Sequence, residues 1–343
     1  MTRTSHDAST SVPNVSISVV IACHTADRWP LLTSAVESVL GQRRRPDQTV
    51  VVVDHNPSLA ARLRSWSRDA TILENTSARG ASGARNTGAF HAGTDLVAFL
   101  DDDAAAHPEW LANLERAFAA APDVVGVGGR VLPDWSGRRP VWLPEEFDWV
   151  VGATHRGAPT GIAEVRNAWA ENMAVRADTF RLVGGFRTGF GKLGAHSRPE
   201  DTDLCIRMAA AGGRWLYTPD AVVSHHVPPG RSTYRFFVRR CYHEGRGKAD
   251  LVALLPASSG GSGPLSDERA YVRRVLPGGV VRNVARFVRR AEVPALQRAV
   301  TILVGLAATV VGFVWQQGVD IVQGRPDAEL HTAVSPTDLP AAS

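Results

Sequence analysis

Cysteine is scarce in this chain of 343 residues, and its cysteines follow no metal-binding or redox pattern. Cys23, Cys205 and Cys241 form no CxxC pair, and one thiol stays unpaired in any disulfide scheme. These absences exclude a disulfide-stabilised scaffold and argue against a structural zinc site. The thiols instead fit a protein of a reducing compartment.

The beginning of the chain lacks the apolar stretch of a secretory signal. Residues 1–15 are polar, so we expect a short disordered arm there and a chain that is not exported. Disorder of the whole chain is excluded, because 44% of the residues are hydrophobic and 21% are charged, an ordinary globular composition. The chain also has no internal repeat.

Basic residues are concentrated in one region. Residues 228–298 contain 14 Lys or Arg against 5 Asp or Glu, although the net charge of the whole chain is only +4. This region leads into residues 299–319, which carry no charged side chain. The combination favours an anionic membrane surface over a nucleic acid as partner. The alternative is a solvated basic face beside a buried helix.

Short β-branched stretches alternate with amphipathic ones from residue 16 to about 220, which predicts βαβ units around a mostly parallel sheet. The expected strands are residues 19–22, 49–53, 71–73 and 96–100. The expected helices are residues 29–40, 82–92 and 108–119. We therefore predict an α/β domain over residues 16–250, whose ligands bind beyond the carboxyl ends of the strands.

The remainder of the chain is less regular. Residues 130–166 are rich in Pro, Trp and Gly and predict an irregular insertion or lid. A flexible linker is expected at 251–268, membrane-associated basic and apolar helices at 269–325, and a disordered tail at 326–343. Within residues 279–291, valines and arginines alternate at helical spacing, so one face of that helix is apolar and the other basic.

Three adjacent carboxylates, Asp101, Asp102 and Asp103, follow the fourth expected strand. Such a cluster is electrostatically costly unless a cation neutralises it. Hard oxygen ligands suit Mg²⁺ or Mn²⁺, which typically join protein carboxylates to the phosphates of a nucleotide. The alternative is a solvated acidic turn in front of the next helix.

Two further segments are candidates for nucleotide binding. Residues 80–88 (GASGARNTG) place small residues and Arg85 where a strand gives way to a helix, so backbone donors and a guanidinium can meet a pyrophosphate. Asp54 ends the second expected strand and suits a contact to a base or ribose, or simply forms a turn.

Taken in order, these segments resemble the family 2 glycosyltransferases with a GT-A fold. The resemblance covers about residues 16–247. It is carried by the aspartate triplet and by residues 18–28 (SVVIACHTADR), 50–54 (VVVVD), 79–88 (RGASGARNTG), 171–176 (ENMAVR), 182–186 (LVGGF), 200–207 (EDTDLCIR) and 219–226 (PDAVVSHH).

The resemblance implies a GT-A nucleotide-binding sandwich followed here by a helical C-terminal extension. It also implies roles on the donor side of the site. Thr25 and Asp54 would hold the nucleobase, and Arg85 the phosphates. Asp102 would bind the ribose or the metal, and Asp101 with Asp103 the divalent ion, Mg²⁺ or Mn²⁺, which stabilises the departing nucleoside diphosphate.

On the acceptor side, the family's base comes from a carboxylate pair, which corresponds to Glu200 and Asp201. We expect Asp201 to take the acceptor proton, unless the pair only satisfies the first turn of a helix. His225 and His226 follow a strand-like stretch, and strand alternation sends them to opposite faces. The resemblance favours His225 as the third metal ligand.

The predicted function is a metal-dependent, inverting transfer of a sugar from a nucleotide-diphosphate sugar to an acceptor hydroxyl. The expected setting is cell-envelope glycan or glycolipid synthesis at the cytoplasmic face of the membrane, with a glycan or lipid-linked acceptor and no nucleic acid. The attachment to the membrane would be either peripheral or through a single C-terminal span at residues 299–319. One alternative is a processive polysaccharide synthase of the same fold, although such enzymes usually carry several membrane spans. Another is an inactive nucleotide-sugar-binding protein, which would be expected to have lost the carboxylates.

Overall fold

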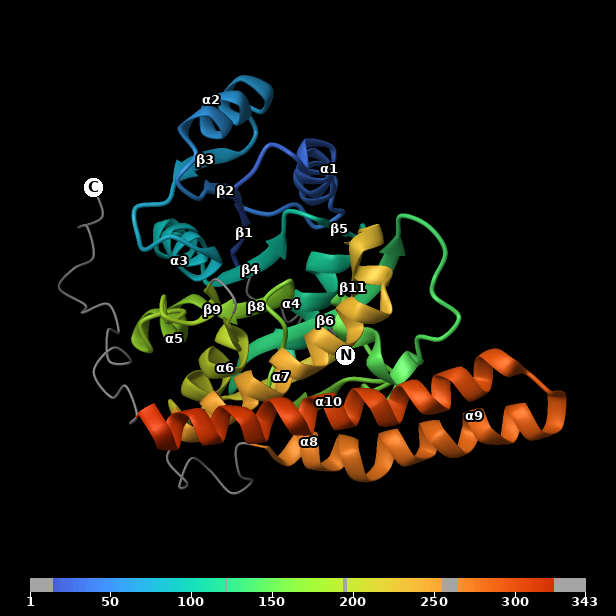
Figure 1. The fold of residues 1–343 in the computed structure, drawn as a ribbon. Helices are drawn as coiled ribbons and strands as arrows, with labels where there is room; N and C mark the ends of the chain where they lie inside the picture. The colour runs from blue at the N-terminus through green and yellow to red at the C-terminus, as the bar shows by residue number, and fades with distance from the viewer. Residues whose placement is uncertain (1–14, 121, 194–195, 255–264, 324–343) are drawn as a thin grey trace, which may run out of the picture.

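The computed structural model describes residues 15–120, 122–193, 196–254 and 265–323. Figure 1 shows a central sheet with helices around it and a long helical hairpin, α9–α10, along one side. The helices are α1 (Trp29–Leu40), α2 (Pro57–Trp66), α3 (Ala81–His91), α4 (Trp110–Ala119), α5 (Ala177–Leu182), α6 (Glu200–Ala210), α7 (Tyr234–Leu254), α8 (Ser266–Ala270), α9 (Leu276–Arg290) and α10 (Val293–Gln323).

Nine strands of the described residues form one mixed sheet, in the order β3-β2-β1-β4-β8-β6-β11-β5, with β7 paired to β11. A separate hairpin joins β9 and β10. The strands are β1 (Ile17–Cys23), β2 (Gln48–Val53), β3 (Thr71–Glu74), β4 (Leu96–Asp101), β5 (Ala104–Ala106), β6 (Val124–Trp135), β7 (Ala163–Val165), β8 (Asn172–Arg176), β9 (Gly191–Leu193), β10 (His196–Arg198) and β11 (Arg214–Val227).

The first half of the sheet, β3-β2-β1-β4, is parallel throughout. Its strands are almost continuous apolar stretches because helices cover both faces, and β2 for example is buried from Thr49 to Val53. The register pairs Cys23 with Val53 and Ala22 with Asp101. The carboxyl ends of β1, β2 and β4 therefore meet at one edge of the sheet, which is where such sheets bind ligands.

The second half of the sheet is mixed. β8 runs antiparallel between β4 and β6, while β6 and β11 are parallel to each other. The fold class predicted from the sequence is confirmed, and the mostly parallel sheet is found in the first half of it. The pairing changes at β8 because this strand returns from an irregular segment, so no helical crossover imposes a parallel neighbour.

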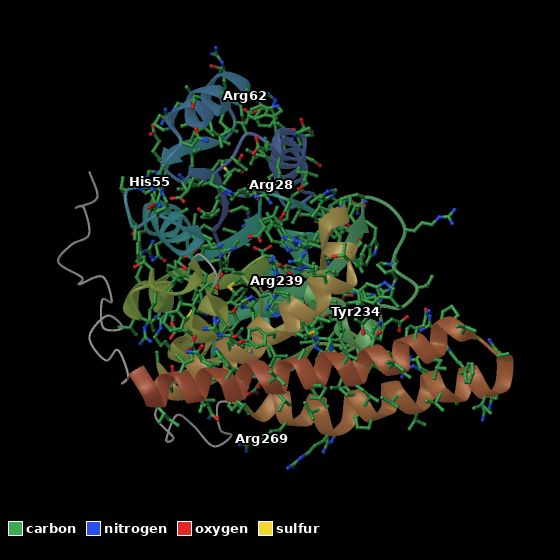
Figure 2. The ribbon with its side chains drawn as sticks, viewed as in Figure 1. Arg28, His55, Arg62, Tyr234, Arg239 and Arg269 are labelled. Atoms are coloured by element: carbon green, nitrogen blue, oxygen red, sulfur yellow. The ribbon has the colours of Figure 1, made fainter. Side chains whose placement is uncertain are left out.

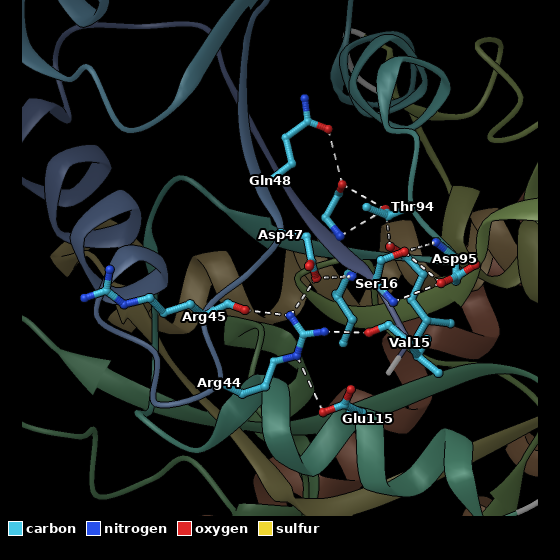
Figure 3. A network of polar contacts seen from close by, with 12 residues as sticks. Val15, Ser16, Arg44, Arg45, Asp47, Gln48, Thr94, Asp95 and Glu115 are labelled. Carbon is cyan, nitrogen blue, oxygen red and sulfur yellow. Dashed lines mark hydrogen bonds and ion pairs between the residues drawn. The ribbon is translucent and has the colours of Figure 1, made fainter. Parts of the chain in front are cut away.

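Polar contacts hold the amino ends of β1, β2 and β4 together (Figure 3). The Asp47 carboxylate accepts from the backbone N–H of Ile17 at 2.8 Å and from Arg44 at 2.8 Å. The Ser16 hydroxyl donates to Asp95 at 2.7 Å. β1, β2 and β4 thus begin from one connected network, which holds their register and leaves the opposite ends free for the site.

The C-terminal helices pack on the sheet domain through an apolar cluster that is separate from the two clusters around the central sheet. It contains Phe147 of the 3₁₀ helix η1 (Glu145–Val151), Phe237 of α7 and Ile302 of α10. The ring centroids of Phe147 and Phe237 lie 5.3 Å apart. α10 packs along α7 on one side and α9 on the other (Figure 1). The helical extension is therefore attached to the sheet domain through the insertion that contains η1.

The structure agrees closely with the element boundaries expected in the first half. Strands β1–β4 contain the predicted segments, and α1 has the predicted bounds. The helix expected from residue 108 begins at Trp110, because residues 107–110 form a turn in which Trp110 N–H donates to the His107 carbonyl. Residues 130–166 include the end of β6, η1 and β7, and are otherwise irregular as expected.

Three of the expected segments lie largely outside the described residues. These are the arm at 1–15, of which only residue 15 is described, the tail at 326–343, and the middle of the linker at 251–268. At the two ends of that linker the chain is helical, since α7 continues to Leu254 and α8 begins at Ser266.

Candidate active site

Arg28 and the aspartate triplet meet at the carboxyl edge of the sheet. The triplet forms the turn between β4 and β5, and Asp102 and Asp103 are buried. The Arg28 guanidinium lies 2.9 Å from Asp102 and 2.6 Å from Asp103. The Arg28 side chain, labelled in Figure 2, is partly exposed, whereas Asp102 and Asp103 are buried beneath it. Sequence reasoning assigned no role to Arg28, although it comes five residues after β1 in one of the recognised segments.

Arg85 of α3 joins the triplet to the carboxylate pair of α6. Its guanidinium lies 2.6 Å from Asp101 and 3.4 Å from Glu200. Burial would lower the pKa of Arg85, but the charges of Asp101 and Glu200 outweigh it and raise that pKa above its ordinary value. Gly80 is the N-cap of α3, and its φ of +120° is a conformation that suits glycine. The structure therefore places Arg85 between the expected metal site and the expected base.

His225 is brought to the triplet by strand pairing. β11 runs antiparallel to β5, so His225 stands opposite Ala104, next to Asp103. Its Nε2 atom lies 3.3 Å from Asp103 Oδ1, and its ring is buried. His226 points the other way, where its Nε2 atom is 3.1 Å from the Ser136 hydroxyl. The alternation expected for the two histidines is thus present.

The protonation of this cluster follows from its burial and its partners. Burial raises the pKa of Asp102 to about 7, against the lowering effect of Arg28. For Asp103 burial acts in the same direction, but the hydrogen bond and charge of His225 outweigh it and lower the pKa to about 2. Burial would lower the pKa of His225, yet Asp103 and Glu171 raise it to about 9. The Asp103–His225 contact is therefore a charged pair, and a cation that binds the His225 imidazole would have to displace a proton from it.

Asp54 is held by the loop that leads into α3. Its carboxylate accepts from the Asn75 side chain at 2.6 Å and from the Gly80 N–H at 2.9 Å. His55 Nδ1 lies 2.8 Å from the same group. Burial would raise the pKa of Asp54, but these hydrogen bonds hold it below its ordinary value. Thr25 lies in the loop after β1, where its hydroxyl accepts from the Asp27 N–H at 3.1 Å. Through its contacts with Asn75 and Gly80, Asp54 thus holds the turn that precedes α3, in addition to any contact with a ligand.

Glu200 and Asp201 open α6, and both line the cavity of the site. Burial, with the neighbouring charge of Asp201, raises the pKa of Glu200 to about 7. Burial also raises the pKa of Asp201. Asp203 has a different environment, because it is buried between Arg187 at 3.0 Å and Arg207 at 2.7 Å. Asp203 is therefore a structural residue of this helix start.

Glu171 is a residue of the site that sequence reasoning missed. It lies just before β8, it lines the same cavity, and its Oε1 atom is buried without a hydrogen-bond partner among the described residues. Burial raises its pKa to about 7, with His225 acting against this. A buried carboxylate oxygen without a partner is costly, so it marks a place where a hydrogen-bond donor of a ligand would fit. Its position in the segment ENMAVR was visible, but nothing in the sequence indicated its burial.

Part of this set of residues lines one cavity of about 1430 Å³, whereas Thr25, Asp54, Asp102, Asp103 and His225 do not line it. Its lining includes Arg85, Asp101, Glu171, Glu200 and Asp201 from the sheet domain. Its opposite wall comes from the C-terminal helices α7, α8 and α10 and from the π-helical turn η3 (Tyr271–Val275). The carboxylate pair Glu200–Asp201 thus lies between the sheet domain and the helical extension.

Ion pairs hold that opposite wall together. Lys248 of α7 lies 2.8 Å from Glu268 of α8, and Glu268 also contacts Arg166 at 2.7 Å. On α7 itself, Arg240 lies 2.7 Å from Glu244. Some basic residues of this part of the sequence therefore form ion pairs inside the protein, where they hold α7 and α8 around the cavity.

The donor set at the triplet fits a hard divalent cation. Among the residues that the structure describes, no three His, Cys, Asp or Glu side chains are gathered tightly enough to hold an ion as they stand. Arg28 and Arg85 supply the positive charge instead. However, Asp103 and His225 are already in contact, and the buried His225 Nδ1 atom has no partner within the described chain. Carboxylate oxygens and imidazole are suitable ligands for Mn²⁺ or Mg²⁺.

Comparison with known proteins identifies relatives among the glycosyltransferases. The family model described as glycosyl transferase family 2 matches residues 18–183. A glucosyl-dolichyl phosphate glucuronosyltransferase from Haloferax volcanii is 33% identical over 306 residues, which are 88% of this chain and 96% of that protein. A pre-mycofactocin glycosyltransferase from Mycobacterium tuberculosis is 32% identical over 190 residues, 55% of this chain and 38% of that protein.

A solved structure has the same fold. It is a mannosyltransferase from Pyrobaculum calidifontis in complex with GDP-Man and Mn²⁺, with a TM-score of 0.55 and 19% sequence identity over 87% of each chain. The similarity to the Haloferax protein extends into the helical extension, beyond the segment that the family model covers. By its sequence and its fold, this chain belongs to glycosyltransferase family 2.

Proposed function

We propose that this glycosyltransferase moves a sugar from a nucleotide-diphosphate sugar to a hydroxyl of a glycan or lipid-linked acceptor, with inversion at the anomeric carbon and with a divalent cation. One observation carries the proposal. A single cavity is lined both by Asp101 of the triplet and by the carboxylate pair Glu200–Asp201. Leaving-group stabilisation and acceptor activation therefore have their residues in the same space.

The donor half of the cavity would hold the nucleotide diphosphate. Asp101, Asp103 and His225 would bind the cation, Mn²⁺ or Mg²⁺, with Asp102 at the ribose or at the ion. When bound, such an ion stabilises the negative charge that develops on the leaving diphosphate. Arg85 would face the phosphates, and Thr25 and Asp54 the nucleobase. The presence of Mn²⁺ with GDP-Man in the Pyrobaculum mannosyltransferase supports the use of a divalent cation with a nucleotide sugar.

The acceptor half would provide the base. As the acceptor oxygen forms its bond to the anomeric carbon, its proton passes to Asp201, and the bond from that carbon to the diphosphate oxygen breaks. A raised pKa suits Asp201 for this transfer, because a stronger base takes a proton from a hydroxyl more readily. Glu200 would hold Arg85 in place, and Glu171 would accept a hydrogen bond from a sugar hydroxyl.

The acceptor is proposed to be carried by a lipid or to lie close to a membrane. The Haloferax relative is named for a glucosyl-dolichyl phosphate, and it is similar to this chain over nearly its whole length. The described residues include one helix, Val293–Ile321, that is long and apolar enough to cross a membrane. We place the enzyme at the cytoplasmic face, in the synthesis of envelope glycans or glycolipids.

A panel of nucleotide sugars tests the proposal. Each donor is incubated with the purified protein after exhaustive chelation, and again after Mn²⁺ or Mg²⁺ is added back, while nucleoside diphosphate release is measured. We expect release from one donor class and only with metal. The Asp201→Asn variant should release little, while Asp69→Asn, an exposed aspartate far from the site, serves as the matched control. Release that is undiminished by chelation would contradict the metal-dependent mechanism.

A further inference from the structure

We propose that the α9–α10 hairpin docks flat on an anionic lipid surface, and that α10 does not cross the membrane. By length and composition α10 qualifies as a span. Its packing in the folded protein argues otherwise, because one face of the helix is committed to the protein and only the other face is free.

The two faces of α10 follow helical periodicity. Its buried positions, among them Ala295, Ala299 and Ile302, pack on the protein. Most of the exposed apolar positions are separated by three, four or seven residues, so they lie on one side of the helix. They are Val293, Leu296, Val300, Leu303, Val310, Val311, Val314, Trp315 and Ile321. Such a stripe along one side is the pattern of a helix that lies in an interface, since a spanning helix contacts lipid all round.

Close backbone contacts attach the buried face of α10 to α7. A side-chain Cβ added at Gly312 would lie 2.0 Å from the Tyr242 carbonyl oxygen. Likewise, a Cβ at Gly245 of α7 would lie 1.9 Å from the Thr309 carbonyl oxygen of α10. Both glycines are therefore required for this approach, and the two helices are fitted to each other at two places about one turn apart along α10.

α7 cannot accompany α10 into hydrocarbon. Arg246 of α7 donates to Gln316 of α10 at 2.8 Å, and α7 also carries the ion-paired Arg240, Glu244 and Lys248. Charged side chains at the centre of a bilayer are costly. If α10 were to span, it would have to leave α7, and the glycine contacts would be lost. In-plane docking keeps every one of these contacts.

α9 adds the charge that favours an anionic surface. Its side chains Val281 and Val288 are 68% and 75% exposed, and with Val284 they line an apolar groove of about 400 Å³. Exposed arginines, Arg286, Arg289 and Arg290, flank these valines on the same helix. Apolar side chains beside exposed arginines match acyl chains beside anionic headgroups.

The position of the hairpin connects this surface to the active site. Figure 1 shows α9 and α10 at the opposite end of the molecule from β1, β2 and β3. Arg269 of α8 lies at that same end (Figure 2). Leu276 of α9 and Leu306 of α10 line the cavity that contains Asp201. Provided that the proposed function holds, a lipid-linked acceptor would reach Asp201 from the docked side.

Vesicle sedimentation of the full-length protein tests the surface without any sugar substrate. We expect binding to phosphatidylcholine mixed with phosphatidylglycerol and weak binding to phosphatidylcholine alone. Val281→Asp with Val288→Asp should lower the partition coefficient roughly 10- to 100-fold, and Arg289→Gln with Arg290→Gln roughly 10-fold or more. The control is Leu182→Asp, because Leu182 is 76% exposed but belongs to α5. Equal losses in the control, or none in the hairpin variants, would overturn the proposal.

Cysteine labelling decides between docking and crossing. The native cysteines are buried, so Arg290→Cys and Gln317→Cys place accessible thiols near the two ends of α10. In sealed membrane vesicles of both orientations, an impermeant maleimide should label both positions from the same side. Labelling from opposite sides would establish a span and overturn in-plane docking.

A second copy of the chain is the competing occupant of this face. If the valine variants convert a dimer to a monomer and leave vesicle binding unchanged, the hairpin is a dimer interface and the proposal is wrong. The hairpin variants should keep the rate of donor hydrolysis, since none of these residues lies in the catalytic machinery. If the wild-type protein binds vesicles as expected but hydrolyses no nucleotide sugar, the proposed function is wrong and the docking proposal still holds.

Discussion

The parallel half of the sheet and the C-terminal hairpin use apolar residues in opposite ways. Strands β1, β2 and β4 bury almost every side chain under helices, and the carboxylates Asp54 and Asp101 stand at the carboxyl ends of β2 and β4. The hairpin buries one face of α10 and leaves valines and leucines of the other exposed. The first region therefore needs nothing outside itself to complete its core, whereas the second is suited to an apolar partner.

This difference separates chemistry from location. Charges in the first region are few, buried and compensated, as in the contacts of Arg28 with Asp102 and Asp103. In the hairpin, Arg289 and Arg290 are exposed. A substitution in the first region should change turnover, and one in the hairpin should change membrane binding. The following predictions test that division, beginning with the largest expected effect.

The strongest test of the chemical region is Asp103→Asn. We expect turnover to be abolished while the fold is retained, because one ligand charge of the proposed cation site is lost. Turnover with the preferred donor and the circular dichroism spectrum are measured together. Full activity in this variant would contradict the proposed role of the triplet in binding the cation. Unchanged vesicle binding would support the separation of turnover from membrane binding.

Asp201→Asn should have the next largest effect. Removal of a general base costs about 10²-fold or more in rate, while donor affinity should change little because the residue faces the acceptor. Single-turnover kinetics and calorimetric donor binding give the two quantities separately. If donor affinity collapses and the residual rate is normal, Asp201 is a binding residue or a helix cap.

The pH profile tests the carboxylate pair as a unit. The pKa of Glu200 lies at about 7 and that of Asp201 is raised. Glu200 therefore gains a proton near neutrality, and Asp201 gains one at a higher pH than an ordinary aspartate. A protonated carboxyl cannot accept the acceptor proton, so we expect kcat/KM at saturating metal to fall at a higher pH than the value of about 4 at which an ordinary carboxylate titrates. An acid limb at the ordinary carboxyl range would contradict the geometry.

Glu171→Gln should lower kcat/KM by about 10-fold, on the scale of one hydrogen bond to a charged group. The amide keeps the size of the side chain and can still accept one hydrogen bond. Because Glu171 Oε1 lacks a partner among the described residues, the thermal stability of the apo protein should be retained or increased. A loss of stability with unchanged kinetics would make Glu171 a structural residue.

The smallest expected effect is Gly312→Leu in the hairpin. The added side chain would force α10 away from α7, at a cost of about 1–3 kcal/mol in the free energy of unfolding. Gly318→Leu is the matched control, because no atom lies within 4 Å of a Cβ built there. Thermal unfolding in detergent measures both variants. If Gly312→Leu is as stable as the control, the close α7–α10 packing is incorrect.

Much of the first region was predictable because its physics is local. Apolar stretches followed by Asp54 and by Asp101 mark the ends of parallel strands, and parallel register brings those ends together. The approach of His225 to Asp103 followed from strand alternation only once the pairing of β11 with β5 was known. The proposed roles of these residues remain predictions, whereas the arrangement is a property of the fold.

The contacts that escaped prediction are long-range. Arg28 meets the triplet across 74 and 75 residues of sequence, and nothing in its own segment distinguishes it from a surface arginine. Glu171 required knowledge of its burial. The basic region at 228–298 was expected to face a membrane, but Lys248 is ion-paired inside the protein, and only tertiary structure separates such residues from Arg289.

The stereochemistry of the transferred sugar tests the central claim most directly. With a single base, Asp201, and direct attack by the acceptor hydroxyl, the anomeric configuration of the first product must be opposite to that of the donor. Proton NMR of the product, recorded before any anomeric equilibration, gives the answer. The account predicts an inverted linkage that forms only with a divalent cation, and a retained configuration would contradict it.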